Sequence, residues 1–175
     1  KDVRKYPELK EYRKGGNRQK NKLPVWVAFS YFELGTVTMM YNYLRGDLRK
    51  AILVYSFAKT TYAKGDPDVM DTWLDAVRNL RNYCVHNSML VGMTSSVVLM
   101  DSNDDATLLQ ADNDLFSRIY ALKKLIPIDD TDNMKKDIKK LINKTPVDVY
   151  LLGILPSNWE EIYDRFKNDL KEIDV

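Results

Sequence analysis

The chain has 175 residues, of which 45% are hydrophobic, and a net charge of +2, so it can bury a real core and should form one domain, or one domain with a tail. Its single cysteine excludes a disulfide framework and favours a reducing compartment. The sequence shows no signal peptide and no apolar run long enough to cross a bilayer, so we expect a cytoplasmic protein without a membrane partner. Glycine and proline are scarce and apolar residues recur with a 3.6-residue period, which predicts an all-α fold.

The positive charge is concentrated at the start of the chain. Residues 1–22 contain nine basic and three acidic residues, interleaved with Tyr6 and Tyr12, whereas the remainder is net negative. We predict that 1–22 is a basic arm, or the remnant of a longer N-terminal region because the chain starts at Lys1, and that 23–175 is the helical domain. The arm could follow an RNA backbone and stack a base, or could be a solvated, mobile tail. The candidate RNA-binding residues in the arm are Arg13, Arg18 and Lys20.

Two helices are predicted after the arm. Pro24 opens the first, which is apolar on nearly all sides as far as Leu44 and so is expected to be the central helix of a bundle. Gly35 within it indicates close packing against a neighbour. Asp47 is expected to cap the second helix, which ends near Gly65. Its apolar positions include Leu48, Ile52 and Tyr55.

The helix that follows contains the only histidine of the chain. Asp66 supplies an N-cap and Pro67 a first-turn proline, so we predict a helix from Pro67 to about His86. One apolar stripe faces a core: Met70, Trp73, Leu74, Val77, Leu80 and Cys84. The opposite face is polar: Asp75, Asn79, Asn82 and His86. Arg81 lies on the flank of the stripe, half turned inward.

The second half of the chain is predicted to be a long loop followed by more helices. The loop covers about 87–107 and could contain a short extended piece at the β-branched residues Val97 and Val98. Asp101, Asn103 and Asp105 resemble the start of a calcium loop, but that loop requires glycine where the chain has Ala106, so helix capping is the preferred interpretation. Further helical segments are predicted at 108–126, 131–144, 146–152 and 157–170, the last with Ser157 and Glu160 as a capping box. The predicted bundle therefore has at least five helices and one shared core: Trp26, Phe29, Trp73, Val77, Leu80 and Leu122.

Arg81, Asn82 and His86 converge near one helix end and suit phosphodiester chemistry in RNA. A histidine can take a proton from a 2′-hydroxyl or give one to a leaving 5′-oxygen, and an always-charged guanidinium can hold the phosphate as negative charge builds on it. Arg78, on the same helix, is a further candidate for RNA binding. No metal or nucleotide cofactor is implied. An arginine with a histidine five residues later also occurs by chance, and such a histidine is usually a surface group.

Three separated motifs give the chain a resemblance to a known family. Arg81-Asn82, followed by His86, matches the signature of the HEPN superfamily, and Leu23-Pro24-Val25-Trp26 followed by Gly35-Thr36 resembles the "LPxW…FGT" helix of the abortive-infection (Abi) family of bacterial phage-defence proteins within it. Pro156-Ser157-Asn158-Trp159 resembles the closing element of that family. The family commonly has an acid where this chain has Ser30, so Glu33 is a possible supporting acid, and it often has an arginine where this chain has Met89.

The resemblance implies a HEPN-like helical bundle and a metal-independent endoribonuclease that acts as a toxin against phage. His86 would be the general acid/base, Arg81 would stabilise the phosphoryl charge and Asn82 would orient the site, leaving a 2′,3′-cyclic phosphate. It also implies a homodimer with a composite site. An antitoxin or non-coding RNA is a possible further partner. The alternatives are a non-catalytic RNA- or partner-binding module and a plain scaffold bundle.

Overall fold

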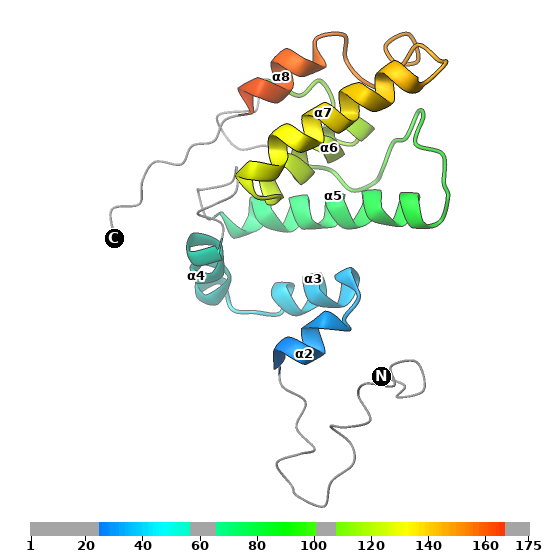
Figure 1. The fold of residues 1–175 in the computed structure, drawn as a ribbon. Coiled ribbons are helices and arrows are strands. Elements are labelled where there is room, and N and C mark those ends of the chain that lie inside the picture. Colours follow the sequence, from blue (N-terminus) through cyan, green and yellow to red (C-terminus); the bar gives the residue numbers. More distant parts are fainter. Residues whose placement is uncertain (1–24, 57–65, 101–107, 167–175) are drawn as a thin grey trace, which may run out of the picture. The chain divides into compact units, whose positions relative to one another are not determined.

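The computed structural model describes residues 25–56, 66–100 and 108–166, and the chain divides into two compact units, Lys1–Met40 and Tyr41–Val175. The described residues form seven helices and no strand (Figure 1), so the predicted all-α fold with at least five helices is confirmed. In the same parts of the chain, no helix is both long and apolar enough to cross a membrane. The predicted basic arm, the helix end at Gly65 and the acidic series 101–105 lie outside the described residues.

The first described helices show that the single helix predicted from Pro24 to Leu44 is wrong. The chain forms α2 (Val25–Ser30) and α3 (Leu34–Asn42), separated by a break at residues 31–33. The backbone N–H of Tyr31 donates to the carbonyl of Ala28, which ends α2, and the Glu33 carbonyl accepts from two amides of the first turn of α3. Gly35 therefore lies in the first turn of α3, where it weakens the helix less than it would in a helix interior. Phe29 is exposed rather than part of the predicted core.

Helix α4 (Gly46–Ser56) exposes the side chains that the sequence pattern identified as its apolar positions. Leu48, Ile52 and Tyr55 are exposed, whereas Leu53 is buried and belongs to the core of the second unit. The helix begins at Gly46, so Asp47 lies in its first turn rather than at its cap, and pairs with Arg45.

Helix α5 (Pro67–Val85) begins as its sequence predicts. The Asp66 side chain accepts hydrogen bonds from the amides of Asp68 and Val69 and caps the helix, with Pro67 in the first turn. The predicted apolar stripe holds at its N-terminal end, where Met70 and Trp73 are fully buried, and is wrong at its C-terminal end, where Cys84 is exposed. Burial of the stripe decreases toward the C-terminal end of α5, where Leu74, Val77 and Leu80 are half-buried.

The core of the second unit is a cluster of aromatic rings. Trp73 is fully buried, with its ring edge-on to Tyr120 at a centroid distance of 5.7 Å and its indole N–H donating to the Met100 carbonyl at 2.7 Å. Tyr120 in turn meets Phe166 edge-on at 4.6 Å. Such edge-to-face pairs are worth about 0.5–1.5 kcal/mol beyond their buried area. Of the predicted core, Val77 packs against this cluster, while Leu80 and Leu122 are half-buried outside it.

Helix α6 (Leu115–Leu125) crosses α5 and carries buried cations that the sequence did not reveal. It begins at the cap Asp114. The prediction that 108–114 is helical is therefore wrong. Arg118 is fully buried and donates to the carbonyls of Val97 and Asp112, and burial lowers the pKa of its guanidinium. Arg118 thereby ties the loop after α5 to α6, and that loop contains no extended strand among its described residues.

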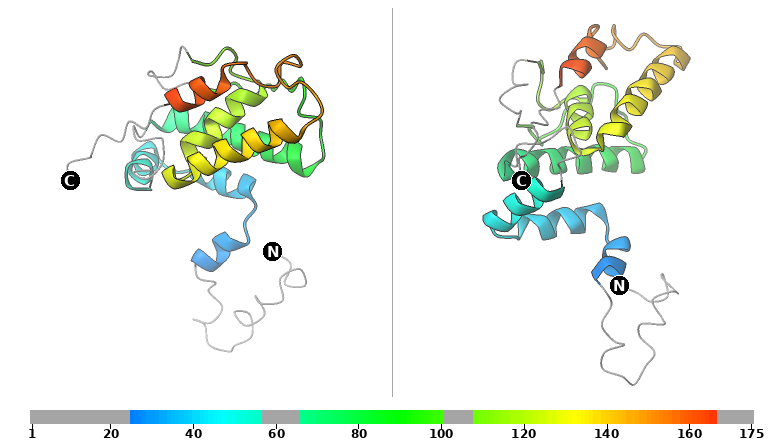
Figure 2. Two further views of the ribbon diagram at one scale, coloured as in Figure 1. Left: turned by 45° about the horizontal axis from the view of Figure 1, so that its top comes forward. Right: turned by 60° about the vertical axis from the view of Figure 1, so that its left-hand side comes forward.

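Helices α7 (Ile128–Lys144) and α8 (Trp159–Arg165) complete the unit (Figure 2). The Tyr163 hydroxyl donates to the Thr131 carbonyl at 2.8 Å, and the buried ammonium of Lys123 donates to the carbonyls of Tyr163 and Phe166 at the end of α8. Three predictions here are wrong. Leu141 is exposed rather than inside, residues 146–152 form turns rather than a helix, and the cap of α8 is Asn158 instead of Ser157.

Candidate active site

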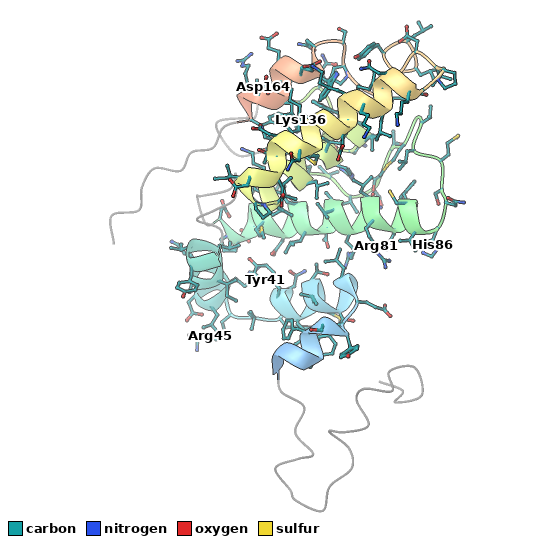
Figure 3. All side chains as sticks on the ribbon, in the orientation of Figure 1. Tyr41, Arg45, Arg81, His86, Lys136 and Asp164 are labelled. Carbon is teal, nitrogen blue, oxygen red and sulfur yellow. The ribbon has the colours of Figure 1, made fainter. Side chains whose placement is uncertain are left out.

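Arg81, Asn82 and His86 lie together at the C-terminal end of α5. Arg81 and Asn82 belong to its last turns, and His86 is the C-cap residue (Figure 3). All three side chains are exposed, so the prediction that Arg81 is half turned inward is wrong. Because α-helical residues rise 1.5 Å each, Arg81 and His86 are separated by about 7.5 Å along the helix axis.

The backbone at the helix end holds His86 in a defined position. The amide of Asn87 donates to the Cys84 carbonyl at 3.3 Å, and the amide of Ser88 donates to the Tyr83 carbonyl at 2.9 Å. This pair of bonds is a Schellman motif, which requires a left-handed residue after the cap. Asn87 takes that conformation with φ of 55°, which asparagine tolerates better than most residues. The sequence analysis missed this residue, although an asparagine directly after a helix is a recognisable C-terminal signal.

Two of the three polar side chains of the site, those of Arg81 and Asn82, contact each other directly. A guanidinium nitrogen of Arg81 donates to the side-chain oxygen of Asn82 at 3.2 Å. The side-chain amide nitrogen of Asn82 remains able to donate to a bound ligand, and so do the four other N–H groups of the Arg81 guanidinium. One turn later, the His86 amide donates to the Asn82 carbonyl at 3.0 Å. Asn82 therefore contacts Arg81 through its side chain and the backbone of His86 through its carbonyl.

Exposed apolar side chains lie close to this polar group in the sequence. Val85 is 58% exposed, Met89 76% and Val91 40%. They flank His86 in the sequence on both sides. Exposed apolar residues next to convergent polar groups are typical of a binding surface rather than of a solvated helix end.

The other predicted site residues lie elsewhere on α5, in the first unit or outside the described residues. Arg78 forms an ion pair with Asp75 at 2.9 Å on the polar face of α5. Glu33 lies in the first unit, exposed in the break between α2 and α3, and Arg81 and His86 lie in the second. Arg13, Arg18 and Lys20 lie outside the described residues.

A second polar cluster, which the sequence analysis missed, lies near the start of α5. Arg49 of α4 pairs with Asp71 and lies over the Tyr41 ring, with 5.9 Å from the guanidinium carbon to the ring centroid. Burial, with a smaller contribution from the charge of Asp71, raises the pKa of Tyr41 to about 12. Burial also raises the pKa of Asp71, against the hydrogen bond from Arg49. Asp71 precedes His86 by 15 residues, about 22 Å of helix, so this cluster is separate from the candidate site.

Two other features of the second unit are also separate from the candidate site. A pocket of about 270 Å³ lies between the start of α6 and the turn before α8, lined by Phe116, Leu155 and Asp114 among others and by none of the three site residues. Among the described residues, no group of three or more His, Cys, Asp or Glu side chains is placed to hold a metal ion.

The comparison with protein-family models decides the family. Residues 1–91 match the model of the Abi-like protein family, which is more than half of the chain and includes Arg81, Asn82 and His86. The chain belongs to the Abi-like protein family. The matched residues of this Abi-like protein contain the Leu23–Trp26 motif and the helix with the candidate site, while the Pro156–Trp159 element lies beyond them. No curated protein and no solved structure matches the chain.

Proposed function

We propose that this Abi-like protein is a metal-independent endoribonuclease that acts as a toxin in abortive infection. The observation that carries the proposal is the arrangement of Arg81, Asn82 and His86 at one helix end. A permanent cation, an amide and an imidazole are all exposed there, with Arg81 hydrogen-bonded to Asn82. These groups supply the charge stabilisation and the proton transfer that cleavage of RNA by its own 2′-hydroxyl requires.

The reaction follows from the groups present. His86 takes the proton from a 2′-hydroxyl, the 2′-oxygen forms a bond to phosphorus, and the bond from phosphorus to the 5′-oxygen breaks. The leaving 5′-oxygen receives a proton from a general acid, a role that the protonated His86 of a second copy would fill, so the products are a 2′,3′-cyclic phosphate and a 5′-hydroxyl. Arg81 binds the non-bridging oxygens as negative charge builds on them, and Asn82 holds the Arg81 guanidinium toward the site.

A second copy of the chain would complete this scheme. One histidine cannot easily serve both as the base on one side of the phosphate and as the acid on the other, and His86 is the only histidine in the sequence. The exposed apolar residues around His86, Val85 and Met89 among them, offer surface that a two-fold contact would bury. We therefore propose a homodimer in which two Arg81/His86 sets face one phosphate. A single-chain protein with a solvated polar face is the competing arrangement.

The second candidate function is a non-catalytic module that binds RNA or a protein partner, such as an antitoxin. The apolar residues around the polar group favour it, because binding alone would use the same surface. The two functions differ in whether His86 is needed for cleavage or only for binding.

The test is to incubate the protein with labelled RNA in EDTA and to compare wild type with His86→Ala, His86→Gln and Arg81→Ala. Arg45→Ala is the matched control for Arg81, because Arg45 is also an exposed arginine of the second unit but pairs with Asp47 away from the site (Figure 3). We expect wild type and Arg45→Ala to cleave and to leave 5′-hydroxyl ends. Loss of a general acid/base typically costs about 10²–10⁴-fold in rate. Full cleavage by the His86 variants would remove His86 from the mechanism, and RNA binding without cleavage by wild type would favour the second function.

A further inference from the structure

Helix α7 carries its lysines in two rows that differ in their partners. In the first row, Lys135 pairs with Asp164 at 2.7 Å and Lys139 with Glu160 at 2.9 Å, both on α8. These two lysines lie four residues apart and hold α7 to α8. Their charges are therefore matched by carboxylates within the unit.

The second row has no such partners. Lys136, Lys140 and Lys144 are exposed, and no carboxylate of the described residues lies within ion-pair distance of any of them. Residues four apart lie on one side of a helix and rise about 6 Å per step, so the three ammonium groups form a line along the C-terminal half of α7. We call Lys136, Lys140 and Lys144 the α7 lysine row.

An exposed aromatic residue follows this row. Tyr150 lies in the turns after α7, six residues beyond Lys144, and is 42% exposed. Proteins that bind single-stranded RNA combine a line of positive charge, which follows the phosphates, with aromatic rings on which bases stack. The α7 lysine row and Tyr150 supply both elements within one stretch of chain.

One end of the row lies on the same side of the second unit as the candidate active site. Both belong to the second unit, and the views of Figures 1 and 2 agree that the C-terminal ends of α5 and α7 lie toward the same side of that unit. The last residue of the row, Lys144 at the end of α7, therefore lies on the same side of the second unit as the C-terminal end of α5.

We infer that the α7 lysine row binds the phosphate backbone of a single-stranded RNA substrate outside the cleaved bond, with Tyr150 as a stacking platform at its end. This inference rests on the proposed endoribonuclease function and extends it by naming a substrate-binding surface. Lysines near a helix C-terminus also interact favourably with the helix dipole, but that effect alone produces no salt-dependent RNA binding.

The two rows of α7 provide a matched experiment. The double variant Lys136→Gln/Lys140→Gln removes two unpaired charges, and Lys135→Gln/Lys139→Gln removes two paired charges from the same helix at the same spacing. Binding to a short single-stranded 2′-O-methyl RNA is measured across a salt series, because this probe keeps every phosphate but has no 2′-hydroxyl to react. Each single-strand phosphate contact contributes about 0.7 to the slope of log K against log salt, so the first variant should lower the slope by about 1.4. The second variant should leave the slope close to that of wild type.

Tyr150→Ala gives an independent measurement. Loss of one base stack typically weakens binding by about fivefold to 100-fold, with no change in the salt slope because no charge is removed. Equal slopes for the two lysine variants, or no RNA binding by wild type, would overturn the inference. Failure of the proposed function is distinguishable, because it would appear as no cleavage by wild type or as cleavage that does not depend on His86, whatever the salt slopes are.

Discussion

Trp73→Ala tests whether the aromatic cluster of the second unit holds the fold together. The Trp73 side chain is fully buried, meets the Tyr120 ring at 5.7 Å and donates its indole N–H to the Met100 carbonyl at 2.7 Å. Truncating a buried tryptophan to alanine typically costs about 3–5 kcal/mol through lost transfer energy and the cavity left behind. In a chain of this size, that loss corresponds to a fall in Tm of about 6–20 °C.

The matched comparison is Leu80→Ala on the same helix. Leu80 is half-buried and lies outside the core cluster, so its truncation should cost about 1–2 kcal/mol. Trp73→Phe keeps a ring against Tyr120 and removes the hydrogen bond, and should fall between the two. Urea denaturation followed by far-ultraviolet circular dichroism measures all three. A cost for Trp73→Ala no greater than that for Leu80→Ala would refute the reasoning from burial.

Three further predictions concern the two ends of α5. Tyr41 keeps its proton to a pKa of about 12 in the folded state, against an ordinary value of 10.0, so stability should be fully present below about pH 10 and should fall as the pH rises toward 12. Urea midpoints across this range should fall less for Tyr41→Phe than for wild type, and identical curves would contradict the assignment. Asn87→Gly should be well tolerated, whereas Asn87→Val should cost about 1–2 kcal/mol in urea unfolding, because a β-branched residue resists the left-handed conformation at that position. If two copies each contribute His86 to one site, adding His86→Ala chains under exchange conditions should lower RNA cleavage with the square of the wild-type fraction, and a linear fall would contradict the composite site.

The parts of the fold that the sequence predicted correctly depend on local signals. Asp66 and Pro67 mark the start of α5 by capping chemistry that needs only neighbouring residues, and Met70 and Trp73 follow the helical period into the core. The candidate site is equally local, because Arg81, Asn82 and His86 lie within two turns of one helix. A short sequence motif is therefore enough to place the three residues at one helix end.

The parts that the sequence did not predict depend on distant partners. Arg118 and Lys123 are charged residues that would ordinarily be assigned to a surface, yet both are buried because the carbonyls of Val97 and Phe166, far along the chain, accept their hydrogen bonds. Leu141 and Cys84 follow an apolar period but are exposed, since the periodicity fixes only which side of a helix they share and not how far a neighbour covers it. The pairing of Arg49 with Asp71 joins two helices and has no sequence signal.

The burial of Trp73 makes the first half of the chain dependent on the second. The family match ends at residue 91, but the ring that packs on Trp73 and the carbonyl that accepts its N–H belong to residues 120 and 100. The half of the chain that carries the family signature therefore depends for its core on a half that the signature does not cover. A replacement of that second half would keep the core around Trp73 only if it still presented an aromatic ring and a carbonyl acceptor to the tryptophan. A chain cut after residue 91 should therefore leave Trp73 without its packing partners, and chaperones and proteases should remove the product.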